Sequence, residues 1–214
     1  MIRHLRFALL LALAASPLAA QAYNYPSLQL PVLAEREYNF AGATAGNAGT
    51  SLYVQWRESA QPAWQFSLEG GLATPKQGNT RVLLGGGLAW QALRSQEELP
   101  FDIALTIGAG LSSGSGANVV RIPVGAVVGH TFALDGGFTV TPFAHPRLSL
   151  DRCSNCSAGA SDSKLDVDVD LGANFEVNKQ VAFRVAALFG GSNYFGATNA
   201  VGFSLAWTPK GLRK

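Results

Sequence analysis

Apolar and polar residues alternate over long stretches of the chain, most clearly from residue 165 to residue 177. The odd positions there are Leu, Val, Val, Leu, Ala, Phe and Val, whereas the even positions include Asp166, Asp168, Asp170 and Glu176. Successive side chains of a β-strand point to opposite faces. The stretch is therefore predicted to be a strand with one apolar and one acidic face, because a helix would spread these acids around all its sides.

Nine further stretches are predicted to be strands, and turn-forming Gly, Pro, Asn and Ser residues separate them. They span about residues 35–44, 50–58, 63–74, 80–92, 100–112, 118–133, 137–150, 180–190 and 198–207. A tilted strand needs about 9–11 residues to cross a bilayer, and these stretches reach about that length. We predict an all-β fold, an antiparallel up-and-down transmembrane β-barrel of ten strands, with eight strands as the alternative.

Connection lengths and aromatic residues predict an orientation. The connections at 59–62, 134–136 and 178–179 are short, whereas those at 151–163 and 191–197 are the longest. Outer-membrane barrels have short periplasmic turns, longer outside loops and girdles of aromatic residues at the membrane interfaces. Aromatic residues gather at the strand ends beside the short turns, namely Trp56, Trp64, Trp90, Phe101, Phe132, Phe138, Phe175 and Trp207. We expect this rim to be periplasmic.

The face opposite the apolar one carries the charges and many Gly and Ala residues. The charged residues predicted to line the lumen are Arg57, Glu69, Arg81, Asp102, Arg121, Asp166, Asp168, Asp170, Glu176 and Arg184. An isolated charge in such an interior is costly. We therefore expect the acids to pair with arginines across the lumen.

The first 22 residues have the features of an export signal. Arg3 and Arg6 precede an apolar run at 7–15, and Ala20-Gln21-Ala22 forms a small-residue cleavage site. We expect residues 1–22 to be a signal peptide, 23–34 an extended leader, 35–207 the barrel and 208–214 a C-terminal tail. Loss of the two arginines leaves 14 basic against 14 acidic residues. A balanced charge gives no support to nucleic-acid binding.

The two cysteines of the chain are Cys153 and Cys156. Two thiols cannot form a four-cysteine zinc site, and an exported protein is in an oxidising environment. A local disulfide within the 151–163 loop is the interpretation that we favour, and free thiols are the alternative.

The last predicted strand resembles the C-terminal β-signal by which outer-membrane barrels are recognised for assembly. Gly202, Leu205 and Trp207 fill that pattern, although Ala200 stands where a polar residue is usual and residues 208–214 follow the aromatic residue. With the signal peptide and the strands, the mature chain resembles the outer-membrane β-barrel domain class. This resemblance implies outer-membrane lipid and the barrel assembly machinery as partners, and the bacterial outer membrane as location.

No motif with clear chemistry is evident. Asp166, Asp168 and Asp170 do not start an EF-hand loop, because Leu171 and Val177 replace the required Gly and Glu. His145 and Ser149 share a strand face but are about 13 Å apart, too far for a nucleophile and its base. Gly85-Gly86-Gly87 has no following helix to bind phosphate. We expect no enzyme activity, catalytic residue, cofactor or metal.

Three functions remain as hypotheses. The first is a structural or surface-interaction role in the outer membrane, with an unidentified extracellular ligand. The second is a narrow channel with an acidic lumen, and the third is a barrel enzyme that modifies lipid. A soluble, lipocalin-like barrel is the alternative for the location.

Overall fold

The computed structural model describes residues 25–114, 116–157, 160–190, 194 and 199–210. Ten long strands form its wall: β1 (Arg36–Ala45), β2 (Gly49–Gln61), β3 (Trp64–Thr74), β4 (Arg81–Leu93), β5 (Asp102–Gly114), β6 (Ala117–Gly129), β8 (Thr139–Ser157), β9 (Ala160–Glu176), β10 (Val181–Gly190) and β11 (Asn199–Trp207). A two-residue strand, β7 (Phe132–Ala133), and two single-turn 3-10 helices, η1 (Gly46–Ala48) and η2 (Asp135–Gly137), lie in connections. Among the described residues, no helix is long and apolar enough to cross a membrane.

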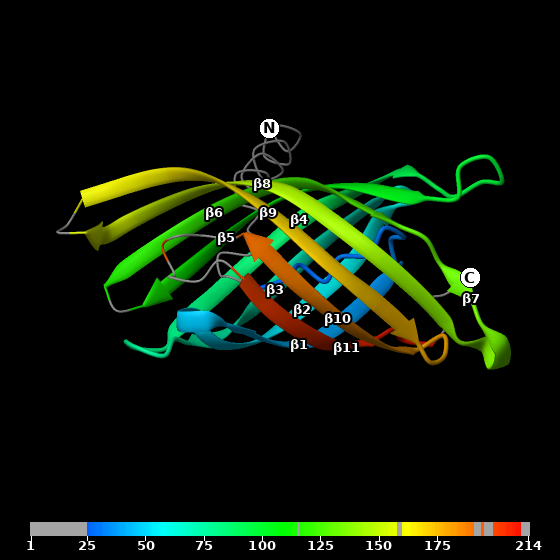
Figure 1. Cartoon of the computed structure of the whole chain (residues 1–214), viewed down its shortest axis with the longest axis horizontal. Coiled ribbons are helices and arrows are strands. Elements are labelled where there is room, and N and C mark those ends of the chain that lie inside the picture. Colours follow the sequence, from blue (N-terminus) through cyan, green and yellow to red (C-terminus); the bar gives the residue numbers. More distant parts are fainter. Residues whose placement is uncertain (1–24, 115, 158–159, 191–193, 195–198, 211–214) are drawn as a thin grey trace, which may run out of the picture.

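The ten strands close into an antiparallel barrel (Figure 1). Each long strand pairs with its neighbours in the chain, β6 pairs with β8, and the first strand pairs with the last. At this seam the register runs from Tyr38 opposite Trp207 to Thr44 opposite Val201. The predicted fold class and the strand number of ten are therefore confirmed, and the alternative of eight strands is wrong.

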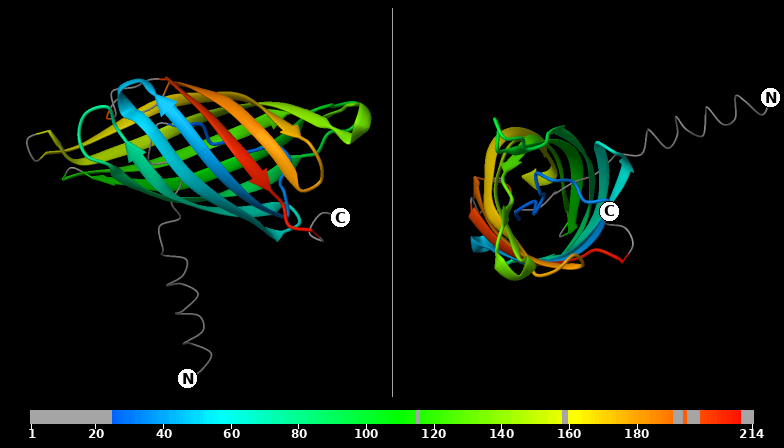
Figure 2. Two further views of the ribbon diagram at one scale, coloured as in Figure 1. Left: turned by 90° about the horizontal axis from the view of Figure 1, so that it is seen from below. Right: turned by 90° about the vertical axis from the view of Figure 1, so that its right-hand side faces the viewer.

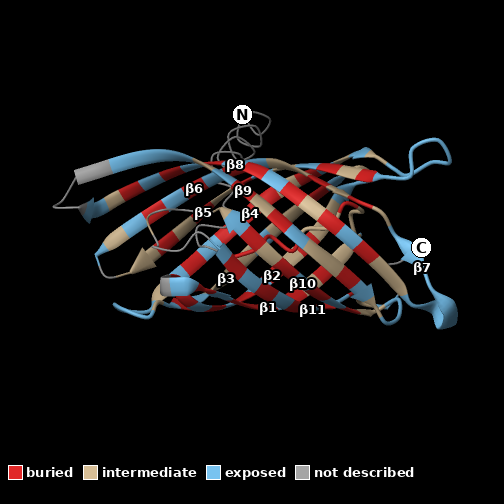
Figure 3. Cartoon of the chain, in the orientation of Figure 1, coloured by how far each residue is buried: buried red, intermediate tan, exposed pale blue. Residues whose placement is uncertain are grey.

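The burial of side chains alternates along the strands, so that stripes of buried and exposed residues run around the wall (Figure 3). In β11 every second residue is exposed, and these residues are Asn199, Val201, Phe203, Leu205 and Trp207. Residues between them, such as Ser204 and Ala206, point into the buried lumen. The apolar face is thus the outer one, which is the reverse of a water-soluble barrel.

Aromatic side chains lie together on the outer surface at one end of the barrel. Trp64 stacks on Trp90 with ring centroids 6.1 Å apart, and Tyr38 stacks on Trp207 at 5.5 Å. The connections at residues 62–63, 94–101, 130–138 and 177–180 lie at this end, which we call the girdle end. Of the eight predicted girdle residues, seven are exposed and Trp56 is partly buried. The opposite end, with η1 and the tip of the β8–β9 hairpin, is called the far end.

The predicted long loop at 151–163 is wrong. Strand β8 continues to Ser157 and β9 starts at Ala160, with Asp151 opposite Lys164. The polar composition of this segment is typical of a loop. Strands β8 and β9 nevertheless remain paired with each other along it. On the neighbouring sides, pairing ends at Asp168 with β10 and at Ser154 with β6. The hairpin therefore projects beyond the rest of the far end (Figure 1).

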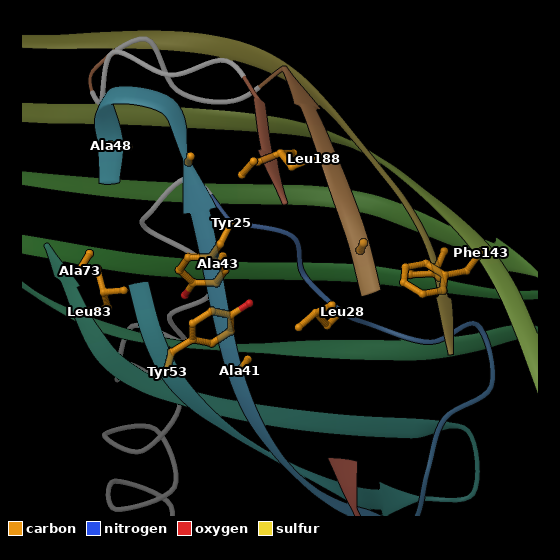
Figure 4. Close-up of a cluster of buried hydrophobic side chains, with 14 residues drawn as sticks. Tyr25, Leu28, Ala41, Ala43, Ala48, Tyr53, Ala73, Leu83, Phe143 and Leu188 are labelled. Carbon is orange, nitrogen blue, oxygen red and sulfur yellow. The ribbon is translucent and has the colours of Figure 1, made fainter. Parts of the chain in front are cut away.

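The leader lies inside the barrel. Residues 25–34 contain no helix or strand, and the right-hand view of Figure 2 shows this segment, in blue, within the ring of strands. From Tyr25 the segment runs toward the girdle end, where β1 begins. Apolar side chains of the leader and wall form a cluster in the lumen (Figure 4), which includes Tyr25, Leu28, Ala41, Ala43, Tyr53, Leu83 and Leu188. The core of this molecule is thus built around the leader.

A charge placed on the outer face tests whether that face meets lipid. Val124 lies in the middle of β6 and is half exposed, whereas Leu134, equally exposed, lies in the girdle-end connection. We expect Val124→Arg to lower the free energy of unfolding of the bilayer-inserted barrel by about 2–4 kcal/mol, and Leu134→Arg by about 1 kcal/mol or less. Denaturant titrations in phospholipid vesicles measure both. Equal losses would contradict a lipid-facing wall.

Candidate functional site

Wall side chains bind the main chain of the leader from several strands. Gln65 of β3 donates a hydrogen bond to the carbonyl of Ala34 at 2.8 Å, and Gln91 of β4 donates to that of Pro31 at 2.8 Å. The Gln91 amide oxygen also accepts a bond from the Leu33 N–H at 3.1 Å. The girdle-end half of the leader is therefore fixed by amides that reach its backbone.

Glu37 is the centre of a buried charge cluster at the seam. Its carboxylate accepts hydrogen bonds from Arg57 of β2, at 2.9 Å, and from both terminal nitrogens of Arg184 of β10. All three side chains are at most 3% exposed. Asn39 adds a bond to Glu37 and accepts one from Arg184. One carboxylate thus ties together strands on both sides of the point where the barrel closes.

The same two arginines bind the leader. The carbonyl oxygen of Leu28 accepts hydrogen bonds from Arg57 and Arg184, both at 3.2 Å. Arg57 also donates to the carbonyl of Ser27 at 3.0 Å, as does Gln55 at 3.3 Å. Leu28 has a left-handed backbone with φ of 53°, which costs about 1–2 kcal/mol for a residue with a Cβ. The two guanidinium groups and complete burial of the Leu28 side chain hold this conformation.

His145 of β8 connects the leader to the middle of the wall. Its Nδ1 atom lies 2.6 Å from the Ser27 hydroxyl, and its Nε2 atom lies 2.9 Å from the Thr106 hydroxyl. Asp170 of β9 accepts a hydrogen bond from the Ser27 N–H at 2.9 Å and pairs with Arg147 at 2.7 Å. Ser27 and Asp170 both face the Nδ1 side of the ring, so Nδ1 holds the leader while Nε2 is bonded to the wall.

Tyr25 is the deepest described residue of the leader and lies against the wall. Its ring stacks on that of Tyr53 with centroids 4.0 Å apart (Figure 4), and its hydroxyl donates to Glu69 at 3.0 Å. Tyr53 in turn donates to the carbonyl of Pro26 at 3.3 Å. A small cavity of about 50 Å³ between leader and wall, near Glu69 and His145, has room for a few water molecules.

Beyond the leader, a second charge cluster fills the far-end half of the lumen. Arg121 of β6 pairs with Asp168 at 2.8 Å and with Asp151 at 3.1 Å. Ser149 donates to Asp168 at 2.6 Å, and Arg81 donates to Ser112 at 2.7 Å and to nearby carbonyls. Across the described part of the chain, no group of three or more His, Cys, Asp or Glu side chains is arranged to hold a metal.

Among the predicted lumen charges, Asp168 pairs with Arg121, as expected of acids and arginines in the lumen. Arg57 and Arg184 instead meet Glu37, and Asp170 meets Arg147, neither of which was among the predicted residues. Glu69 contacts Tyr25 and Gln55, and Asp102 accepts a bond from the Ser95 N–H at 3.0 Å. Asp166 and Glu176 are partly buried.

Sequence reasoning missed Glu37, Arg147, Asp151 and the place of the predicted leader in the lumen. Glu37 has the inward parity of β1, shared with Asn39 and Ala41, so alternation could have included it. The leader carries no periodic signal. The predicted signal peptide at 1–22 lies outside the described residues.

The remaining predicted residues lie on the wall. Cys153 and Cys156 form a disulfide within β8, around a bulge at which Asn155 has φ of 63°. They are part of a strand and not of a loop. In the predicted assembly signal, Leu205 and Trp207 face outward, whereas Gly202 faces the lumen beside Pro26.

Comparison with known proteins finds similarity in fold only. No protein-family model matches the sequence. No curated protein matches it either. Solved structures that match include LpxR from Salmonella typhimurium, with a TM-score of 0.47 and 9% identity over 81% of this chain and 100% of that chain. The KdgM porin has a TM-score of 0.40 and 7% identity over 81% and 99%. Ail, the attachment invasion locus protein of Yersinia pestis, has a TM-score of 0.31 and 10% identity over 81% and 96%.

The Glu37 cluster predicts a large effect of removing one charge. Glu37→Gln leaves two buried guanidinium groups without their carboxylate, so we expect the free energy of unfolding to fall by about 3–5 kcal/mol. The matched control is Glu58→Gln, which removes the partly exposed pair between Glu58 and Arg36 and should cost about 1 kcal/mol or less. Denaturant unfolding followed by Trp fluorescence compares the two. A similar small loss in both variants would contradict the central role of Glu37.

Proposed function

We propose that this chain spans the bacterial outer membrane as a plugged barrel with a structural or surface-interaction role, and that it is not an enzyme. The observation that carries the proposal is the seating of residues 25–34 in the lumen, where wall side chains from β2, β3, β4, β8, β9 and β10 bind them. We infer that a lumen filled in this way has no open aqueous path through its girdle-end half. We then expect the function to depend on the outer surfaces of the barrel and not on passage through its lumen.

The outer surface supports the membrane location. The wall exposes apolar side chains at mid-strand positions, such as Val124, Val185 and Phe203, and the girdle end carries the stacked tryptophans. Aromatic rings favour the interface between hydrocarbon and water. With the girdle end in the periplasm, the projecting β8–β9 hairpin faces the outside and is the surface element that we propose for contact with other molecules.

The buried position of His145 supports a structural rather than a catalytic role for it. Its imidazole is 3% exposed, and the leader covers it through Ser27. His145 therefore fits a role in holding the leader through Ser27.

A gated narrow channel is the second candidate function. The described contacts between leader and wall are hydrogen bonds and packing, so the leader can leave without breaking a covalent bond. Behind it lie Arg57, Glu69, Arg147 and Asp170, which would line a charged passage.

Conductance in planar bilayers tests both candidates. We expect the natural chain to show no discrete current steps, because the leader fills the lumen. Replacing residues 25–34 by a Gly-Ser sequence of equal length should produce steps if the wall can conduct. The control replaces residues 75–79, in the β3–β4 connection at the far end, and should stay silent. Steps from the natural chain at the level of the leader variant would overturn the plugged barrel. A silent leader variant would exclude the channel.

A further inference from the structure

The wall recognises the leader mainly through its carbonyl oxygens. Five of them accept hydrogen bonds from wall side chains, and they belong to Pro26, Ser27, Leu28, Pro31 and Ala34. Among the described residues, two leader N–H groups donate to wall side chains, that of Ser27 to Asp170 and that of Leu33 to Gln91. Contacts to the main chain depend little on the identity of the side chains. The lumen therefore has the properties of a binding site for an extended chain.

The excess of donors in the wall fits a segment that contains proline. Proline has a carbonyl acceptor but no N–H donor, and its fixed φ favours an extended backbone. Pro26 and Pro31 accept bonds from Tyr53 and Gln91 and leave no N–H group to be satisfied. The lack of a side chain at Gly202 leaves room for Pro26, because a Cβ at position 202 would lie 3.1 Å from the Pro26 ring.

Three side chains of the leader add selectivity. Tyr25 stacks on Tyr53, the Ser27 hydroxyl meets His145, and the Leu28 side chain is fully buried. These positions require an aromatic ring, a small hydroxyl group and an aliphatic group in that order along the chain. Glu35, which joins the leader to β1, is exposed at the girdle end. A second segment can therefore approach from that side.

We propose that the girdle-end half of the lumen is a binding site for a proline-containing peptide segment that is extended apart from a left-handed residue at the position of Leu28. The chain's own leader is its resident ligand, and a separate chain with the same pattern can take its place. The site does not depend on whether the barrel conducts, so a silent barrel in the bilayer experiment leaves this proposal untouched.

The test separates the leader from the folded barrel. A protease site inserted between Glu35 and Arg36 is cut after folding, and the cut protein is mixed with a fluorescently labelled synthetic peptide of residues 23–34. We expect the labelled peptide to enter at one per barrel, measured by fluorescence anisotropy and by co-elution in gel filtration. A scrambled peptide of the same composition should bind at least tenfold more weakly. A peptide with Pro26→Ala and Pro31→Ala should bind about five- to twenty-fold more weakly, because it is less preorganised.

A wall variant identifies the place of binding. Gln65→Leu removes the donor to the Ala34 carbonyl and the acceptor of the Gln29 amide, so peptide affinity should fall about tenfold. Ser112→Ala, in the far-end half and away from the leader, should leave it unchanged. Heat-modifiable mobility on a denaturing gel checks that each protein remains a barrel. A barrel that retains this mobility but takes up no labelled peptide, or takes up the scrambled peptide equally well, would overturn the proposal.

Discussion

The pairing of one buried carboxylate with two arginines is the interaction on which the rest of this structure depends. Glu37 lies on the first strand, and its partners Arg57 and Arg184 come from β2 and β10, so the cluster spans the seam between β1 and β11. Removing such charges from water is expensive, and good ion-pair geometry together with further hydrogen bonds offsets that cost. Here Arg57 and Arg184 each also donate one hydrogen bond to the Leu28 carbonyl of the leader. Wall closure and leader seating are thereby parts of one network.

The leader solves a packing problem that follows from strand number. About eight strands enclose a lumen that side chains can fill, whereas ten strands enclose a wider one. Many inward positions of this wall are small, as at Ala41, Ala43 and Gly202, and they widen the space further. The leader occupies that space, and its attachment to β1 keeps it at a high effective concentration. This tether helps to offset the strained backbone of Leu28.

Sequence alone predicted the wall well because the wall is governed by a local rule. Alternation with a period of two predicted the strands and the outward face, since both depend only on residues one or two positions apart. The girdle end was predicted from the connection lengths and the aromatic residues at the strand ends. The hairpin at 151–163 was missed because Cys, Ser, Asp and Gly dominate there, although the ladder between β8 and β9 continues. The pairing of Glu37 was missed for another reason. Glu37 and Arg184 are 147 positions apart, and only the closure of the barrel brings them together.

The leader was predicted to be extended, but its place in the lumen could not be read from residues 23–34. An extended segment with two prolines has no period that assigns a face, and its partners lie on six strands. Its carbonyl groups, which every sequence possesses, carry most of the binding. Recognition through carbonyl groups requires no particular side chain of the ligand, so the sequence of the leader does not reveal it. In the wall it requires inward amides such as Gln55, Gln65 and Gln91, which could equally have been solvated lumen residues.

We expect that the leader can leave the lumen without unfolding the wall, although the two share one hydrogen-bond network. When the leader leaves, Arg57 and Arg184 each lose bonds to leader carbonyls but keep Glu37, so no charge becomes unpaired. The backbone ladder of the seam, from Tyr38 to Thr44, involves no leader atom. The groups that are freed are donors facing a lumen that water can then enter, and water can satisfy them. Removal of the leader should therefore cost local contacts and not the fold, which is the physical condition for any exchange of the segment in the lumen.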